Sequence, residues 1–153
     1  MKHKKRYITV SSEQTKKIAK NLIKKILNTK QNKKALVLAL QGDLGSGKTT
    51  FLQGFAKGLG VKEKVLSPTF ILVKRFNLPL THNLKFKSFY HIDCYRLHKP
   101  KEILDIGFKK IISNPENIVA IEWPEKIQRV MPRNAIKFKF SHFGKNKREI
   151  TIK

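Results

Sequence analysis

The stretch that decides the fold is ALVLALQGDLGSGKTT, residues 35–50. Its first part, Ala35–Leu40, is apolar at every position, which is typical of a strand buried on both faces. Its second part, Gly42–Thr50, satisfies the pattern G-x-x-x-x-G-K-S/T and opens a helical stretch, Lys48–Leu59, that Gly60 closes. A buried strand, a glycine-rich turn and a helix in this order predict a loop that binds the phosphates of a nucleoside triphosphate.

The residue types in this turn match the chemistry of phosphate binding. Glycines let backbone N–H groups approach phosphate oxygens, and the helix N-terminus adds its positive end. We expect Lys48 to reach the β- and γ-phosphates, Thr49 to ligate Mg²⁺, and Thr50 to contact the α-phosphate. The expected nucleotide-binding residues of the loop are Asp43, Leu44, Gly45, Ser46, Gly47, Lys48, Thr49 and Thr50. Within this set, Asp43 is better explained as a residue that shapes the loop than as a catalyst.

Two acids end apolar stretches further along the chain. Asp93 ends SFYHID and Glu122 ends IVAIE. The carboxyl ends of parallel strands lie on the same edge of a sheet as the P-loop, so both carboxylates are predicted to face Mg²⁺ or the attacking water. The alternative for each is a surface acid at the end of a strand. The sequence leaves open which of the two ligates the metal directly.

Strands and helices alternate on both sides of the loop. Ser11, with Gln14 three residues later, is a capping-box pattern at the start of a helix. Strands are predicted at Arg6–Val10, Thr69–Phe76, Ser88–Asp93, Ile118–Ile121, Ala135–Phe143 and Arg148–Ile152, and helices at Ser12–Asn28 and, interrupted near Gly107, at Pro100–Ser113. The pattern predicts an α/β fold of one P-loop NTPase domain over residues 1–153, with a mixed, mostly parallel sheet flanked by helices and a C-terminal antiparallel hairpin.

Composition limits the function classes without choosing one. The 34 Lys and Arg residues outnumber the 10 Asp and Glu residues, for a formal net charge of +24. The single cysteine, Cys94, excludes an internal disulfide framework and indicates a reducing compartment. The basic start is followed by no apolar segment, so we expect a cytoplasmic chain with no membrane partner.

The positive charge has two readings. A basic chain is typical of nucleic-acid binding. However, 28 of the 34 cations are lysines spread along the whole chain, and A/T-rich codons would supply them together with the many Ile, Asn and Phe residues. A functional basic face and a solvated lysine-rich surface both stay open.

The only indication of which base the nucleotide carries is that two sequence elements of GTP-binding proteins are missing. The guanine-reading N-K-x-D element and the D-x-x-G switch element of GTP-binding proteins do not occur. ATP is therefore the expected nucleotide.

Four blocks of sequence together carry a family resemblance. They are GDLGSGKTT (Gly42–Thr50), SPTF (Ser67–Phe70), FYHIDCYRL (Phe89–Leu97) and IEWPEKI (Ile121–Ile127). In their order and spacing the chain resembles the TsaE family of bacterial P-loop ATPases, from about Tyr7 to Ile152. It departs from that family in a longer polar insertion at 77–87, in the cysteine at position 94 and in its lysine-rich surface.

The resemblance implies an ATPase that supports the synthesis of threonylcarbamoyladenosine in tRNA. In such systems one enzyme makes threonylcarbamoyl-adenylate, and a TsaD–TsaB pair transfers the group to adenosine 37 of the tRNA. The TsaE-like partner binds that pair and hydrolyses ATP to allow repeated turnover. Any contact with tRNA is expected to be indirect or to use non-specific basic residues.

The resemblance also assigns roles to residues. It implies that Lys48 and Thr50 hold phosphates and that Thr49 and Glu122 hold Mg²⁺. It implies that Asp93 either orients the attacking water or contacts a ligand of the metal without binding the metal itself. It implies that the segment Ser67, Pro68 and Thr69 is a switch that senses the γ-phosphate. Trp123 and Arg148 are expected to approach the nucleotide, with packing and a solvated strand edge as their respective alternatives.

Two other function classes stay open. A small-molecule kinase would also use a P-loop and Mg²⁺, but usually with clustered arginines, and the six arginines here are scattered. A non-enzymatic RNA-binding protein regulated by ATP would need a coherent basic face.

Overall fold

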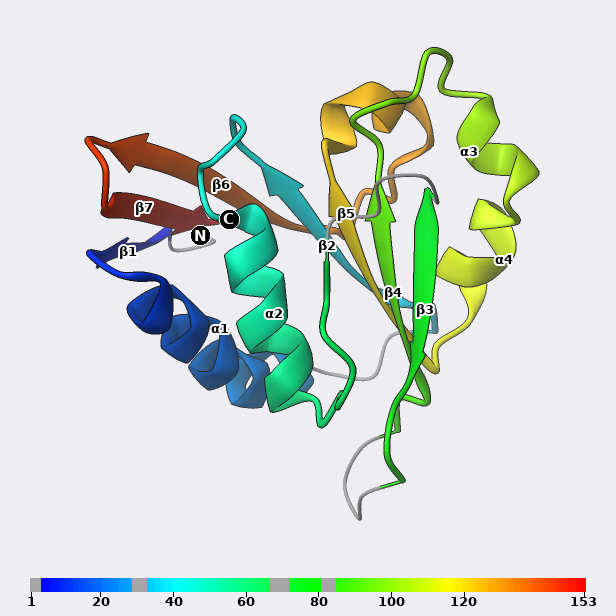
Figure 1. Ribbon diagram of the computed structural model, residues 1–153. Helices are drawn as coiled ribbons and strands as arrows, with labels where there is room; N and C mark the ends of the chain where they lie inside the picture. The colour runs from blue at the N-terminus through cyan, green and yellow to red at the C-terminus, as the bar shows by residue number, and fades with distance from the viewer. Residues whose placement is uncertain (1–3, 29–32, 67–71, 81–84) are drawn as a thin grey trace.

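One mixed seven-stranded sheet runs through the described residues, 4–28, 33–66, 72–80 and 85–153, of the computed structural model (Figure 1). Its strands are β1 (Lys5–Thr9), β2 (Leu36–Gln41), β3 (Val73–Asn77), β4 (Ser88–Asp93), β5 (Asn117–Glu122), β6 (Ile136–Phe143) and β7 (Lys147–Ile152). Its helices are α1 (Ser12–Leu27), α2 (Lys48–Gly58), α3 (Glu102–Asp105), α4 (Phe108–Ser113) and the 3₁₀ helix η1 (Pro124–Val130).

The strand order is β1-β7-β6-β2-β5-β4-β3. The four strands β6, β2, β5 and β4 are mutually parallel and form the centre of the sheet. Antiparallel pairs stand at both ends, where β3 joins β4 and where β6, β7 and β1 follow one another. The predicted α/β fold with a mixed sheet and a C-terminal hairpin is confirmed.

Two hydrophobic cores lie on opposite faces of the sheet. The larger core joins α1 and α2 to the inward side chains of most strands, with Phe51, Phe55 and Phe138 almost fully buried in it. The second core joins α3, α4 and η1 to the other face, where its buried strand residues lie on β2, β5 and β4 and Val73 of β3 packs against them. The sheet is therefore covered on both sides at its centre and on one side only at its β1 end.

The helix start predicted from Ser11 is present. The backbone N–H of Gln14 donates to Ser11 Oγ at 3.2 Å, and Gln14 Oε1 accepts from the backbone N–H of Val10 at 2.8 Å. The side chain of Gln14 thus reaches one residue further back than in the usual capping box, because the extended chain of β1 places the Val10 N–H within reach.

The short helices are also as predicted, since Gly107 separates α3 from α4 with a left-handed φ of 78°. The helix η1 was not predicted, because residues 124–130 lack a regular helical pattern. The predicted strand Thr69–Phe76 is confirmed only from Val73, and residues 67–71 lie outside the described ranges. None of the helices in the described ranges has the length and hydropathy needed to cross a membrane.

The close approach of α1 and α2 depends on Gly54. A Cβ atom at this position would lie 2.5 Å from both Cα and the carbonyl oxygen of Lys16, which are backbone atoms that cannot turn away. We predict that Gly54→Ala lowers the free energy of unfolding by about 1–3 kcal/mol, although alanine is the better helix former by about 0.5–1 kcal/mol. Urea unfolding measures this, with the exposed Lys57→Ala as the control on α2. A gain in stability for Gly54→Ala would contradict the packing.

Candidate nucleotide site

The P-loop joins β2 to α2 and curls around the start of that helix. Gly47 is the N-cap of α2 with a φ of 100°, a left-handed conformation that favours glycine. A Cβ atom on Gly42 would lie 2.7 Å from the carbonyl oxygen of Phe140 and 2.7 Å from Ser46 Oγ. Gly47 is therefore required by its backbone conformation, and Gly42 is required because no space is left for a side chain.

Lys48 lies inside this loop. Its Nζ donates to the carbonyl oxygens of Gly42 and Asp43, the second at 3.0 Å, and lies 4.3 Å from the ring centre of Trp123. Burial lowers the pKa of Lys48, and the negative charge of Glu122 opposes that shift. The ammonium group is therefore held at the mouth of the loop, where a phosphate group would meet it.

Asp43 shapes the loop through its backbone. Its carbonyl oxygen accepts from Lys48 Nζ and from the backbone N–H of Ser46 at 3.1 Å. The backbone of Asp43 is therefore part of the loop structure, and a non-catalytic role of its side chain stays a prediction.

The carboxylate of Glu122 is the buried centre of the site. Glu122 ends β5, is 2% exposed, and stands directly beside Asp93 at the end of β4 in the parallel register. Its Oε1 accepts from Thr49 Oγ1 at 3.3 Å. Glu122 thus connects the carboxyl edge of the sheet to the first turn of α2.

The other carboxylate oxygen of Glu122 has a partner that the sequence did not reveal. His91 Nε2 lies 2.6 Å from Glu122 Oε2, and the His91 side chain is fully buried. A carboxylate only accepts hydrogen bonds, so Nε2 carries the hydrogen. His91 Nδ1 has no hydrogen-bond partner among the described residues, which suits an unprotonated acceptor better than a buried N–H.

Asp93 lies at the same edge in a half-buried position. Its Oδ1 accepts from the backbone N–H of Tyr95 at 3.0 Å. Burial raises the pKa of Asp93, the Tyr95 hydrogen bond opposes this, and the charge of Glu122 adds to it. A cation beside these two carboxylates would relieve their repulsion.

The oxygen donors at this edge fit Mg²⁺. Thr49 supplies a hydroxyl group and Glu122 a carboxylate, which are hard ligands. No group of three or more His, Cys, Asp or Glu side chains arranged for a metal occurs in the described part of the chain.

A cavity of about 730 Å³ opens from these groups. Every predicted nucleotide-binding residue except Asp43 lines it, together with Glu122. The lining residues that sequence reasoning missed include Ser11, Ser12, Thr15, Tyr95, Arg96, Glu102, Lys145 and Asn146. They come from the start of α1 and its N-cap, from the segment between β4 and α3, from the first residue of α3 and from the β6–β7 turn, and only the folded topology brings these segments together.

Trp123 and Arg148 both reach the cavity. Trp123 is the one non-glycine residue with positive φ among the described residues, at 59°, and its ring centre lies 4.9 Å from that of Tyr95. Arg148 lies over the loop, with its Cδ 3.8 Å from where a Cβ of Gly47 would stand, and its NH1 donates to the carbonyl oxygens of Lys145 and Lys147. The predicted switch residues Ser67, Pro68 and Thr69 lie outside the described ranges.

The central parallel strands, the glycine loop and the Lys48–Thr49 pair define an α/β protein of the P-loop class. The family model described as threonylcarbamoyl adenosine biosynthesis protein TsaE matches residues 9–150. The chain therefore belongs to the TsaE family of tRNA threonylcarbamoyladenosine biosynthesis proteins.

Individual relatives agree with this family. The chain is 37% identical over 147 residues to tRNA threonylcarbamoyladenosine biosynthesis protein TsaE of Bacillus subtilis (strain 168), covering 94% of this chain and 82% of that protein. It is 35% identical over 143 residues to the protein of the same name from Rickettsia conorii (strain ATCC VR-613 / Malish 7), covering 93% and 74%. The crystal structure of Bacillus subtilis YdiB matches with a TM-score of 0.70 at 30% identity, covering 99% of this chain and 86% of that one.

The buried pair of His91 and Glu122 predicts that stability losses from substitutions at the two positions are not additive. His91→Leu leaves one oxygen of a buried carboxylate without a donor, so we expect the free energy of unfolding to fall by about 3 kcal/mol. Glu122→Leu alone should also lower the free energy of unfolding, because it removes the hydrogen-bond acceptor of both His91 and Thr49. Combining both changes removes the whole pair, and the loss should then be clearly smaller than the sum of the two single losses. Urea unfolding of the three variants measures this, and additive losses would contradict the pairing.

Proposed function

We propose that this chain is a Mg²⁺-dependent ATPase of tRNA threonylcarbamoyladenosine biosynthesis. The observation that carries the proposal is the contact between Thr49 of the P-loop helix and the buried carboxylate of Glu122. It brings a hydroxyl and a carboxylate together at the mouth of a phosphate-binding loop, which is the donor set that holds Mg²⁺ in P-loop NTPases.

The loop residues bind and orient the triphosphate. The backbone N–H groups of the loop and the N-terminus of α2 face the phosphates, and Lys48 supplies a positive charge to the β- and γ-phosphates. Thr49 and Glu122 would hold the metal, which when bound would neutralise charge that develops on the γ-phosphoryl group. His91 keeps the Glu122 carboxylate in its orientation through the 2.6 Å hydrogen bond.

Asp93 is the proposed group for the attacking water. Its pKa is raised by burial, which makes the carboxylate a better proton acceptor than an exposed aspartate. It also ends the strand beside Glu122, on the edge that carries the P-loop.

The proposed role in the pathway follows the family. The chain would hydrolyse ATP to support turnover of a TsaD–TsaB pair in the cytoplasm and would not itself transfer the threonylcarbamoyl group. The segment Ser67, Pro68 and Thr69 would change the surface offered to that pair when the γ-phosphate is present. ATP is favoured over GTP because the sequence has no guanine-reading element.

A kinase activity is the second candidate. Arg96 and Arg148, which are far apart in the sequence, both line the cavity, and kinases clamp the transferred group with arginines. Measuring the fate of the γ-phosphate separates the candidates, because a hydrolase releases it as inorganic phosphate and a kinase does not.

Release of phosphate with and without a TsaD–TsaB pair tests the proposal. We predict slow release by the isolated chain and faster release with the pair. Lys48→Ala should abolish the activity and weaken ATP binding, since it removes the charge between the β- and γ-phosphates. The exposed Lys57→Ala on the same helix is the matched control and should keep the activity. Full activity of Lys48→Ala would overturn the assignment of the site.

The roles of Asp93 and Glu122 can be distinguished by the Mg²⁺ dependence of variants at the two positions. Asp93→Asn should keep Mg·ATP binding and slow hydrolysis by about 10²–10⁴-fold, as expected when a positioned base is lost. Glu122→Gln should instead raise the Mg²⁺ concentration needed for half-maximal activity. Titration of Mg²⁺ for both variants measures this. An identical metal dependence would mean that the two roles are shared or reversed.

A further inference from the structure

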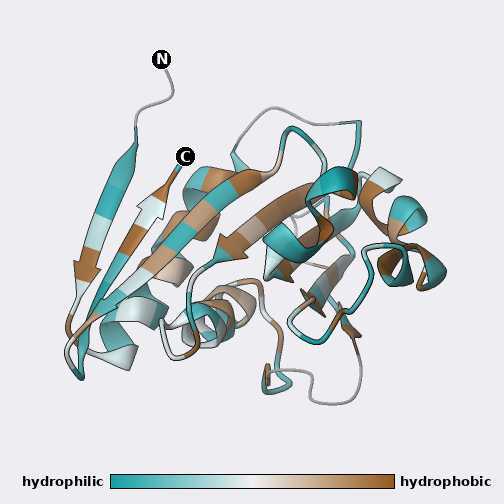
Figure 2. Ribbon diagram, turned by 90° about the horizontal axis from the view of Figure 1, so that it is seen from above, coloured by the Kyte–Doolittle hydropathy of each residue, from teal (hydrophilic) through white to brown (hydrophobic). Residues whose placement is uncertain are grey.

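One face of the sheet is left open at its β1 end. Helices α1 and α2 cover the face on which Phe138, Phe140 and Ile150 are buried. The opposite face is covered by α3, α4 and η1 from β2 to the β3 end of the sheet. In the described part of the chain no helix lies over the outward side of β6, β7 and β1, which Figure 2 shows from above.

The outward positions of these three strands are basic. Successive side chains of a strand point to opposite faces, so the residues that alternate with the buried Phe138, Phe140 and Ile150 point outward. Four exposed cations of the strands occupy such positions, namely Arg6, Lys137, Lys139 and Lys147, and the exposed Lys153 continues β7 by one residue and pairs with Lys137. We call these five residues the basic sheet face.

The strand register gathers these cations into adjacent rows. Lys137 and Lys153 exchange backbone hydrogen bonds of 3.2 and 2.9 Å, so they stand directly opposite each other. In the next row Lys139 and Arg6 flank Thr151 on either side. Like charges directly opposite across strands are destabilising, so this arrangement costs the isolated fold stability.

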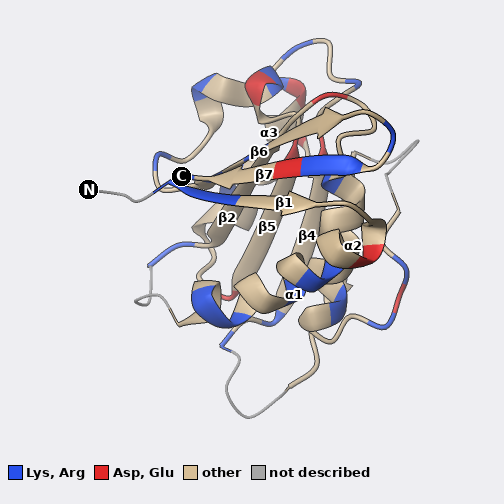
Figure 3. Ribbon diagram, turned by 90° about the vertical axis from the view of Figure 1, so that its left-hand side faces the viewer, with Lys and Arg blue, Asp and Glu red and all other residues tan. Residues whose placement is uncertain are grey.

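Only one acid points outward on these strands among the described residues. Glu149 forms an ion pair of 2.8 Å with Arg6, and the hydrogen bond from Arg6 lowers the pKa of the Glu149 carboxyl. Figure 3 shows this red position on β7 next to blue segments. The four lysines of the face have no acid of their own on it, so their charge is available to an external anion.

We propose that the basic sheet face binds the sugar–phosphate backbone of RNA. Closely spaced cations on an open, uncovered surface match a polymer that carries a regular row of negative charges, and binding would release counterions. The exposed ring of Phe143, opposite Lys147 in the register, adds a surface on which an unpaired base can stack. The choice of RNA over an acidic protein rests on the proposed function in tRNA modification. Binding of RNA by the basic sheet face does not require ATP hydrolysis.

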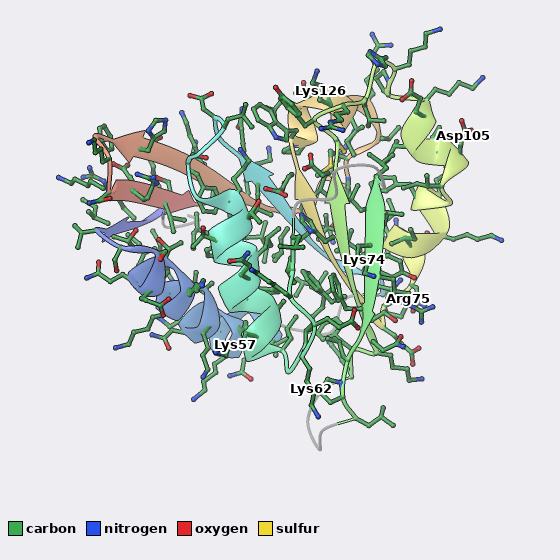
Figure 4. The ribbon with its side chains drawn as sticks, in the orientation of Figure 1. Lys57, Lys62, Lys74, Arg75, Asp105 and Lys126 are labelled. Atoms are coloured by element: carbon green, nitrogen blue, oxygen red, sulfur yellow. The ribbon has the colours of Figure 1, made fainter. Side chains whose placement is uncertain are left out.

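Basic residues elsewhere provide the matched control. Lysines lie on many elements of the fold, and two that Figure 4 labels, Lys57 and Lys62, are exposed and lie outside β1, β6 and β7. A general attraction of RNA by net charge would therefore involve every side of the molecule. Lys17 and Lys24 are exposed on α1, which covers the other side of the sheet.

The test compares two double charge reversals with the same change in net charge. Binding of a fluorescently labelled, unmodified tRNA transcript is followed by anisotropy over a salt series, without ATP, for the wild-type chain, Lys137→Glu/Lys139→Glu and Lys17→Glu/Lys24→Glu. We expect the sheet-face variant to lose at least about 10-fold in affinity at about 0.1 M salt and its salt slope to fall by about two. The α1 variant should keep most of the affinity and nearly the full slope.

Several outcomes would overturn the proposal. Equal losses in the two variants would show that net charge alone attracts RNA, and a wild-type chain that does not bind would exclude the interaction. Loss of TsaD–TsaB capture by the sheet-face variant at unchanged tRNA affinity would assign the face to a protein partner instead. Phosphate release is measured on the same samples, so a failure of RNA binding with intact hydrolysis would leave the proposed ATPase function standing.

Discussion

The site depends on one buried carboxylate with two hydrogen-bond partners. Glu122 is almost completely removed from water, and a buried charge is costly unless it is paired. Thr49 of α2 donates a hydrogen bond to one of its oxygens, and His91 of β4 donates to the other. The carboxylate therefore fixes three elements relative to one another: the P-loop helix, the strand that ends in Asp93, and its own strand.

Aromatic packing holds α2 where this contact can form. Phe51, two residues after Thr49, contacts Phe138 and Phe140 of β6, with ring centres 5.2 and 5.4 Å away. On the next turn Phe55 contacts Phe89 of β4 at 6.0 Å. The helix is thus attached to strands on both sides of β2, and its first turn comes to lie over the carboxyl edge of the sheet. The hydrophobic core and the polar site are two parts of one arrangement.

The sequence predicts those parts of the site that local pattern determines. The strand–loop–helix unit at 35–59, and the meeting of Asp93 with Glu122, follow from apolar runs and from the rule that parallel strands end at one edge. His91 lies inside an apolar strand, and its pairing with Glu122 depends on a register that no local pattern encodes. Position 91 shares a strand face with Asp93 two residues later, which is the one sequence signal that could have indicated it. The left-handed backbone of Trp123 and the basic sheet face likewise need the tertiary structure.

The central claim is that this edge of the sheet receives Mg²⁺ together with ATP. Trp123 is the only tryptophan of the sequence and lies beside Lys48, so its fluorescence reports directly on the site. The most direct measurement is a titration of the chain with ATP, followed by Trp123 emission, in Mg²⁺ and in a chelator. The account predicts a saturable change that requires several-fold less ATP when Mg²⁺ is present. No change in emission, or the same curve with and without Mg²⁺, would contradict it.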